Sequence, residues 1–271
     1  DRAVRIEVLA SEFVEIADMP VAPAKGNLLR SQDPATVPYE FAPFYRTADT
    51  WPAELVTTDA PHVVRDLRGT VVDANVFQYR PASETLRVCT RLVVAVVDDG
   101  PARVNPLVRT RPLDRVDGQF ADLYADHFLN VTSGRYEAVS EDGGLLIIAD
   151  DALASAMQPL VEWKLQRGLD TRLQTLSETG YSFSQIRSAI ATAYADWAPA
   201  YVLLVGDIAQ IPIGSDSDPE YACLVGSDSY PELFVGRFSA ENPDQVATQV
   251  LRTITYERDT PADVAWMQHG M

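Results

Sequence analysis

Hydrophobic and polar positions alternate along parts of the N-terminal half of the chain. In TLRVCTRLVVAVV, one face of the pattern carries Leu86, Val88, Thr90, Leu92, Val94 and Val96. A period of two is typical of a half-buried β-strand. The preceding GTVVDANVFQYR also has strand character, and the turn residues PASE between the two segments predict a β-hairpin. RAVRIEVLASEFVEI predicts one or two further strands.

The C-terminal half has a different pattern. The continuous apolar runs GLLIIAD and YVLLVGD predict strands buried on both faces, with DTRLQTLSE as another strand between them. Three segments with helical spacing alternate with these strands. They are ALASAMQPLVEWKLQRG, SFSQIRSAIATAYADWAP and NPDQVATQVLRTITYERDTP. The order strand, helix, strand, helix, strand predicts a parallel sheet with helices on its faces.

Local signals predict where these helices begin and end. Ser182 or Ser184 and Asn242 are the expected N-cap residues of the second and third helices. In the first helix, Pro159 should cause a kink or limit the first part, and Gly168 should end it.

The change of pattern predicts two domains, a β-rich domain over residues 1–135 and an α/β domain over residues 136–271. A chain of 271 residues is long enough for two domains. The segment SGRY at the boundary combines small residues with an arginine, so it is a candidate for proteolytic processing. An ordinary interdomain linker is the plainer interpretation.

The charge of the chain is strongly acidic, with a formal net charge of −17 at pH 7. Residues 1–135 hold 19 acidic and 15 basic residues, and residues 136–271 hold 20 acidic and 7 basic residues, giving −4 and −13. Such a surface repels nucleic acid and anionic membranes and attracts cations. No run of 18 apolar residues predicts a membrane span. The N-terminus lacks a signal-peptide core, so a signal has been removed or never existed.

The two cysteines do not form a disulfide framework. Cys89 lies within the alternating strand pattern and Cys223 lies between apolar neighbours, so both are interpreted as buried small residues. A catalytic pairing with one of the three histidines is not excluded by the sequence. No GxSxG, P-loop or GxGxxG motif is present.

Three carboxylates are candidate metal ligands, because they lie near the ends of predicted strands. Asp207 ends YVLLVGD, and Asp228 and Glu232 lie in the turn of VGSDSYPELFVGRFS. Hard oxygen ligands in a turn are the composition that Ca²⁺ prefers. A strand-end aspartate more often only caps a turn. The other acidic cluster, SDSDPE, begins like an EF-hand loop but lacks the required glycine and glutamate, and a solvated acidic loop is the favoured interpretation.

Four segments together resemble the gingipain-type family of cysteine peptidases. They are VEWKLQRGLDT (161–171), YVLLVGD with IP four residues later (201–212), Y-x3-VGSDSYPELFVGRFS (221–239) and RTITYERDTPADVAW (252–266). Their order and spacing are similar to those of the family. In the front half, DLRGTVVDANVFQYRPASETLRV resembles the family propeptide. The resemblance implies a β-sandwich-like propeptide followed by a parallel-sheet, caspase-like α/β domain that is incomplete in this chain.

The resemblance also implies specific site residues. A calcium site would take side chains from Asp207, Asp228 and Glu232 and backbone carbonyls from Val225 and Tyr230. Propeptide cleavage would follow an arginine, between Arg135 and Tyr136. The catalytic histidine and cysteine of the family lie further along the chain than the matched segments. No residue here is therefore assigned a catalytic role.

The leading hypothesis is the zymogen portion of a secreted, calcium-stabilised cysteine endopeptidase. Its substrates would be proteins or peptides. Its partner would be the remaining C-terminal part of the catalytic domain, which would be either a second chain or absent here. The propeptide would block the cleft and assist folding. The expected location is secreted or on a bacterial cell surface, after removal of a signal peptide.

Two other hypotheses remain open. The chain could be a non-catalytic, calcium-binding surface or secretion module that keeps only part of the fold. Residues 1–135 could alternatively be a plain β-sandwich adhesion module.

Overall fold

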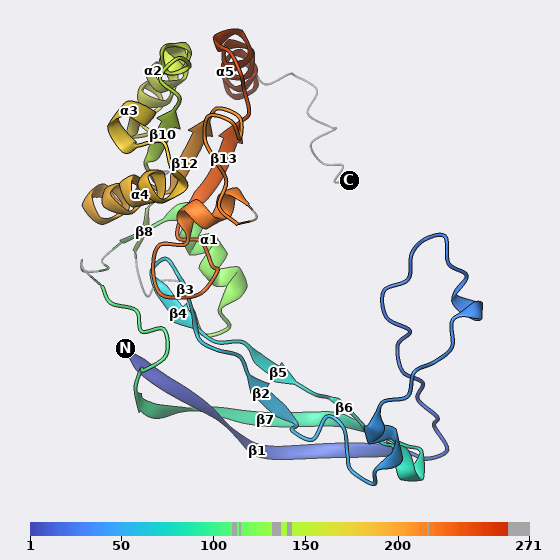
Figure 1. Ribbon diagram of the computed structural model, residues 1–271. Coiled ribbons are helices and arrows are strands. Elements are labelled where there is room, and N and C mark those ends of the chain that lie inside the picture. The colour runs from blue at the N-terminus through green and yellow to red at the C-terminus, as the bar shows by residue number, and fades with distance from the viewer. Residues whose placement is uncertain (110–112, 114, 132–136, 140–142, 216, 260–271) are drawn as a thin grey trace. The chain divides into compact units, whose positions relative to one another are not determined.

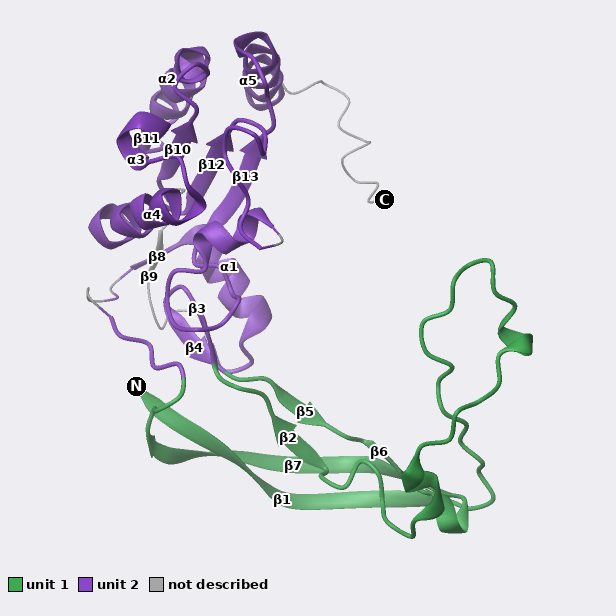
Figure 2. Cartoon of the chain, viewed as in Figure 1, with its two compact units in different colours: residues 1–61, 70–104 green, residues 62–69, 105–271 purple. Residues whose placement is uncertain are grey.

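The computed structural model describes the chain except for residues 110–112, 114, 132–136, 140–142, 216 and 260–271 (Figure 1). The chain divides into two compact units (Figure 2). Unit 1 comprises residues 1–61 and 70–104, and unit 2 comprises residues 62–69 and 105–271. This division differs from the expected domain boundary, because residues 62–69 and the described part of 105–135 belong with the C-terminal unit.

Unit 1 is built from antiparallel strands. Its three-stranded sheet has the order β1 (Arg2–Ile16), β7 (Thr85–Pro101), β6 (Phe77–Arg80), and a two-stranded sheet pairs β2 (Val56–Thr58) with β5 (Val72–Ala74). The hairpin predicted around PASE is confirmed, since β6 and β7 pair across the short 3-10 turn Pro81–Ser83.

The β-sandwich expected for the front half is not confirmed. A sandwich buries alternate side chains between two sheets. In unit 1, which is described throughout, the buried residues are confined to the β6–β7 hairpin, namely Gln78, Tyr79, Pro81 and Thr85. Apolar side chains along β7 remain outside, such as Val96, which is 64% exposed. The alternation predicted the strands correctly, but no layer in unit 1 covers their apolar faces.

Unit 2 contains a four-stranded parallel sheet, as the sequence predicts. Its order is β11 (Thr171–Thr175), β10 (Leu145–Ala149), β12 (Tyr201–Val205), β13 (Phe234–Phe238). All five residues of β10 are buried, because this central strand is covered on both faces. The connecting helices are α2 (Gln158–Gln166), the short α3 (Leu176–Thr179), α4 (Phe183–Trp197) and, after β13, α5 (Pro243–Arg258).

Helices cover both faces of this sheet (Figure 1). Leu146 and Ile148 pack in one cluster with Ile186 and Ile190 of α4. The alternate residues of the same strand pack in a second cluster with residues from α2 and α5, namely Leu145, Ile147, Leu160, Val246 and Val250. This alternation explains why β10 reads as a continuous apolar run.

The predicted helix boundaries are largely confirmed. Ser182 caps α4, its hydroxyl accepting the N–H of Gln185 at 3.3 Å. Asn242 caps α5 in the same way, and Gly168, with φ of +87°, follows α2. Pro159 does not kink a helix but stands in the first turn of α2, after the separate 3-10 turn Ala154–Met157.

Several small elements lie at the amino-terminal end of the sheet strands. The hairpin of β3 (His62–Val64) and β4 (Leu67–Gly69) is antiparallel, and β8 (Arg115–Asp117) leads into α1 (Gly118–His127) and pairs in parallel with β9 (Glu137–Val139). The strands β3 and β8 and helix α1 share a core cluster with the residue that precedes β12, formed by Val64, Val116, Phe120, Tyr124 and Ala200. No helix in the described part of the chain is long and apolar enough to cross a membrane.

Candidate functional site

The turn that precedes β13 contains a fully buried carboxylate, Glu232. Its Oε2 accepts the backbone N–H of Leu224 at 2.6 Å and of Val225 at 3.0 Å. Its Oε1 is buried and has no hydrogen-bond partner among the described residues. Burial raises the pKa of Glu232 to about 7, and the negative charge of Asp228 adds to this, while the two N–H donors oppose it. One oxygen of this carboxyl is therefore without a hydrogen-bond partner among the described residues, which favours its protonated form.

Asp228, in the same turn, is held by N–H donors from three segments. Its Oδ2 accepts the Val63 backbone N–H at 2.8 Å and the Asn105 side-chain amide. Its Oδ1 accepts the N–H of Tyr230 at 2.9 Å. Val63 and Asn105 precede Asp228 by more than 120 residues, so this carboxylate joins distant parts of the chain.

Asn105 also fixes the backbone of the turn. Its Oδ1 accepts the N–H of Ser227 at 3.0 Å. Gly226 has φ of +76°, and a Cβ at this position would collide with the Asn105 side chain. A glycine is required here on both counts.

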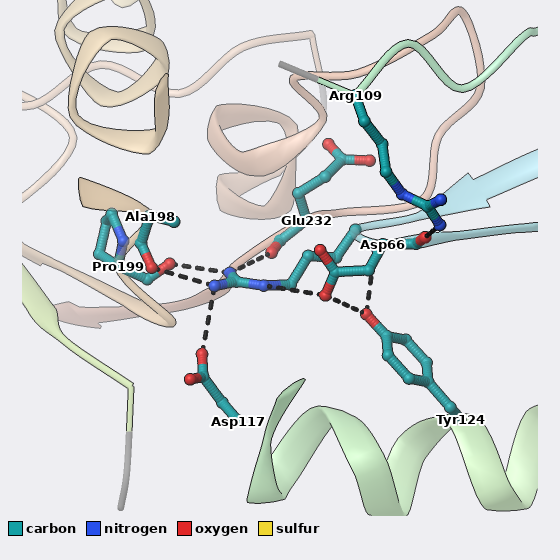
Figure 3. A network of polar contacts seen from close by, with 8 residues as sticks. Asp66, Arg109, Asp117, Tyr124, Ala198, Pro199 and Glu232 are labelled. Carbon is teal, nitrogen blue, oxygen red and sulfur yellow. Dashed lines mark hydrogen bonds and ion pairs between the residues drawn. The ribbon is translucent and has the colours of Figure 1, made fainter. Parts of the chain in front are cut away.

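Arg65 bonds to several groups beside this turn, and Figure 3 labels its partners. Its Nη1 donates to the carbonyl of Pro199 at 2.9 Å and to that of Glu232 at 3.2 Å. Its Nη2 donates to the carbonyl of Ala198 at 3.0 Å and to Oδ2 of Asp117 at 3.2 Å. The side chain is only 6% exposed, so these partners replace water around the guanidinium.

The surroundings of Arg65 explain its position. Ala198 and Pro199 follow the end of α4, where backbone carbonyls lack partners within the helix. The guanidinium also lies over the ring of Phe120, 4.4 Å from its centroid. Asp66 contributes an ion pair at 3.6 Å and accepts the Tyr124 hydroxyl at 2.8 Å, and burial raises the pKa of Tyr124 above its usual value.

Aromatic contacts complete this side of the site. The imidazole of His62 stacks on the Tyr230 ring, with centroids 4.3 Å apart, and lies near Phe128. His62 is 8% exposed, and Val63 is fully buried. The hairpin thus covers the turn that holds Asp228 and Glu232.

Asp207 lies at the other end of the paired strands, so the structure does not bring the five expected calcium ligands together in one group. In the pairing of β12 with β13, Tyr201 aligns with Phe234 and Val205 with Phe238. Glu232 lies before the first of these pairs and Asp207 after the last. At about 3.3 Å per residue, the paired segment alone separates them by about 13 Å, too far for ligands that each lie within about 2.6 Å of one Ca²⁺.

At its own edge of the sheet, Asp207 has local partners. Its Oδ1 accepts the Ser239 hydroxyl at 3.0 Å, and its N–H donates to the carbonyl of Ala240. A hydrogen bond from the N–H of Ile208 lowers the pKa of Asp207, and the Ser239 hydroxyl adds to this. The predicted carbonyl contributors Val225 and Tyr230 lie in the turn with Asp228 and Glu232. No group of three His, Cys, Asp or Glu side chains able to hold a metal occurs within the described ranges.

The acidic loop SDSDPE has a structural role that its composition did not indicate. Asp218 forms a bidentate ion pair with Arg237 of β13. The Arg237 Nη2 and Nε atoms lie 2.7 and 2.9 Å from the two carboxylate oxygens of Asp218. Glu220 accepts the N–H of Ser215 at 3.0 Å. The described part of this loop is therefore bonded to the fold.

The two cysteines lie in different units and are not bonded to each other. Burial raises the pKa of the Cys223 thiol, and the charge of Glu232 adds to this. Its Sγ approaches the carbonyl of Pro219 at 3.6 Å. A catalytic cysteine needs a lowered pKa, so the surroundings of Cys223 disfavour that role.

Sequence reasoning missed Arg65, Val63 and Asn105. No local motif marks them, because their partners are carbonyls and carboxylates far along the chain. The predicted cleavage site, Arg135 and Tyr136, lies outside the described residues.

Comparisons with known proteins place these features in a family. Residues 138–271 match Peptidase family C25, and residues 1–124 match Propeptide_C25. The two matches define a peptidase preceded by its propeptide. The chain belongs to the C25 family of gingipain-type cysteine peptidases.

Individual relatives agree with this assignment. Gingipain R2 of Porphyromonas gingivalis (strain ATCC BAA-308 / W83) is 34% identical over 280 residues, covering all of this chain and 38% of the relative. Lys-gingipain HG66 of Porphyromonas gingivalis is 23% identical, covering 92% of this chain and 15% of the relative. A solved complex of Porphyromonas gingivalis RgpB pro- and mature domains is 35% identical, covers 48% of this chain and 63% of its own, and has a TM-score of 0.41. This chain thus spans well under half of the length of the curated relatives that it matches.

Proposed function

We propose that this chain is the propeptide and first part of the catalytic domain of a cysteine endopeptidase precursor. Residues 1–135 would inhibit the enzyme and assist its folding until cleavage after Arg135. Residues from 136 onward would begin a caspase-like domain that cleaves proteins or peptides. Secretion or display at the cell surface is part of the same proposal and rests on the family resemblance.

The observation that carries this proposal is the integration of residues 62–69 into unit 2. These residues come from the segment that matches the family propeptide, yet Arg65 bonds to carbonyls that flank β12 and β13 of the peptidase segment. An independent adhesion module would have no need of such contacts. A propeptide that folds together with its enzyme would require them.

The proposed catalytic cysteine and histidine belong to a part of the precursor outside residues 1–271. The raised pKa of Cys223 supports this, because a partly buried thiol next to a carboxylate is a poor nucleophile. Cys89 lies on β7 of unit 1, and its Sγ is 3.2 Å from the carbonyl of Arg91. Cys223, with its raised pKa, lacks the environment of an activated thiolate.

Processing is tested in a longer precursor that contains this chain at its front. We expect mass spectrometry to find a mature product that begins at Tyr136. Arg135→Gln should remove that product, because an arginine-directed cleavage loses its recognition residue. Arg103→Gln, at an exposed site in the same half, is the matched control. Continued cleavage of the 135–136 bond in the Gln variant would refute the arginine-directed step.

Calcium is proposed only at the Asp228 and Glu232 pair. The fit is partial: the unpartnered, buried Oε1 of Glu232 near a second carboxylate suits a hard cation, and turn carbonyls or water would have to complete the shell. Asp207 is left out of this proposal, because it follows β12 whereas Glu232 precedes β13 in the strand register. Bound Ca²⁺ would stabilise the turn, a structural role separate from catalysis.

The calcium proposal predicts a metal-dependent melting temperature. Ca²⁺ at about one hundred times its dissociation constant should stabilise the chain by about 2.7 kcal/mol relative to chelator. Asp228→Ala should abolish that difference, whereas Glu241→Gln, on the exposed surface, should leave it. The same melting temperature in chelator and in Ca²⁺ would exclude the site.

A further inference from the structure

We propose that Asn105 and the backbone N–H of Val63 position the carboxylate of Asp228 for Ca²⁺. Val63 and Asn105 belong to residues 1–124, which match Propeptide_C25, whereas Asp228 belongs to residues 138–271, which match the peptidase family. The calcium affinity of the turn would thus depend on a segment outside the peptidase match. This inference rests on the calcium site that forms part of the proposed function, and it assigns the support of one ligand to a distant part of the chain.

Both oxygens of the Asp228 carboxylate accept hydrogen bonds, and the donors come from different parts of the chain. Oδ1 accepts the N–H of Tyr230, two residues along the same turn, at 2.9 Å. Oδ2 accepts the N–H of Val63 at 2.8 Å and the side-chain amide of Asn105. A carboxylate has about four lone pairs, so Oδ1 retains acceptor capacity for a cation while the donors on Oδ2 fix the orientation of the group.

Asn105 is suited to this role by both its backbone and its side chain. Its φ is +46°, in the left-handed region that asparagine tolerates better than most residues. Its side-chain amide donates to Asp228, and its Oδ1 accepts the N–H of Ser227 at 3.0 Å. The residue is 8% exposed. One buried side chain therefore holds both the ligand and the backbone next to it.

The hairpin of β3 and β4 connects the two donors. Val63 of β3 pairs with Arg68 of β4. The Nε of Arg68 donates to the backbone carbonyl of Asn105 at 2.9 Å. The hairpin thus reaches Asp228 twice, once through its own backbone N–H and once through Asn105. These contacts form a closed ring, so each donor restrains the position of the other.

Glu232, the second proposed ligand, is also held by N–H donors on one oxygen. Oε2 accepts the N–H groups of Leu224 and Val225, and the buried Oε1 has no hydrogen-bond partner among the described residues. Two carboxylates of one turn repel each other when both are ionised, unless a cation lies close to them. The hydrogen bonds therefore hold together two acidic groups that a hard cation would stabilise.

Hydrogen bonds to a metal-binding carboxylate affect the affinity for the metal, because they fix the ligand in its binding orientation. Loss of such an outer partner typically weakens metal binding by about ten- to a hundredfold. The coupling is reciprocal: if the hydrogen bonds of Asn105 and Val63 favour Ca²⁺, bound Ca²⁺ must stabilise those hydrogen bonds by the same factor. Calcium and the segment that carries Asn105 would therefore strengthen each other's hold on the turn.

Isothermal titration calorimetry of the full chain with Ca²⁺ tests this inference. Asn105→Gly removes both side-chain bonds while suiting the left-handed backbone, and we expect it to raise the Kd for Ca²⁺ about ten- to a hundredfold. Asn27→Gly, at an exposed position of unit 1, is the matched control and should leave the Kd unchanged. Equal or tighter binding by Asn105→Gly would overturn the inference and leave the calcium site standing. Absence of binding by the wild-type chain would instead refute the calcium site itself, and the inference with it.

Hydrogen exchange in the wild-type chain provides a second measurement, which does not depend on how Asn105→Gly folds. Relative to chelator, saturating Ca²⁺ should slow exchange of the Val63 amide by about tenfold or more, because its acceptor is the proposed ligand Asp228. Exchange of residues 57–60, which are exposed, should stay the same. If Asn105 and Val63 only stabilised the fold, the Val63 amide would exchange equally fast in Ca²⁺ and in chelator. That result would overturn the inference.

Discussion

At the scale of single residues, the amino-terminal edge of the sheet is organised by two buried ionisable groups with complementary partners. Arg65 binds backbone carbonyls, and Glu232 binds backbone N–H groups. Arg65 takes up carbonyls that the end of α4 leaves without partners, and Glu232 takes up two N–H groups of the loop before β13. Burial of a charge is tolerated only with such bonds, so both residues are constrained more by the fold than by their exposed chemistry.

Glu232 gives a pH-dependent stability whose sign follows from its raised pKa. Its folded pKa of about 7 exceeds the ordinary value of 4.5, so between these values the folded chain binds more protons than the unfolded chain. Stability should fall as pH rises from about 4.5 to 7, by on the order of 2 to 3 kcal/mol. Above pH 7 this contribution should be constant.

Thermal unfolding in chelator measures this effect. Glu232→Gln should remove the loss of stability between pH 4.5 and 7, because an amide does not titrate. Glu178→Gln, in an exposed capping position of α3, serves as the comparison. If the stability of the wild-type chain rises between pH 4.5 and 7 by as much as that of Glu232→Gln, the carboxyl of Glu232 is not protonated in the folded chain. That result would contradict the prediction.

At the scale of elements, the order of strands and helices in unit 2 follows from local pattern. Ser182 shows this, because its capping box with Gln185 satisfies N–H groups of the first turn and so marks where α4 begins. Ser182→Ala should lower the unfolding free energy by about 1 kcal/mol. Ser188→Ala, on the exposed face of α4, should change it little. Equal urea midpoints for Ser182→Ala and wild type would contradict the cap.

What could not be predicted from the sequence depends on register and on distant contacts. Asp207 and Glu232 each looked like a ligand near a strand end, but β12 and β13 are parallel and aligned, which places one residue at each edge. Arg65 stands in a hairpin whose sequence, HVVRDLRG, carries no sign of its partners. Those partners are backbone carbonyls more than 130 residues away, and no local propensity encodes them.

At the scale of the whole molecule, apolar surface is distributed unevenly between the two units. Unit 2 buries two large clusters around its sheet, whereas unit 1 buries residues only at its β6–β7 hairpin. Unit 1 therefore gains little stability from its own interior. Its antiparallel strands depend mainly on the backbone hydrogen bonds between them.

This difference predicts two levels of protection from hydrogen exchange. Amides of β10 and β12 should exchange only through global unfolding of unit 2. Amides of β1 and β7 should exchange through smaller openings, at least tenfold faster. Mass spectrometry of peptides from the intact chain separates the two groups. Equal protection of β1 and β10 would show that unit 1 has a stabilising partner that its own residues do not provide.

The chain belongs to a family of cysteine peptidases, and we propose that the nucleophile of its precursor lies outside residues 1–271. The most direct test is alkylation of the active longer precursor, followed by mass spectrometry of the modified cysteine. We predict that loss of activity coincides with modification of a cysteine outside residues 1–271. We also predict that Cys89→Ala and Cys223→Ala keep full activity. Inactivation by modification or replacement of Cys223 or Cys89 would contradict the account.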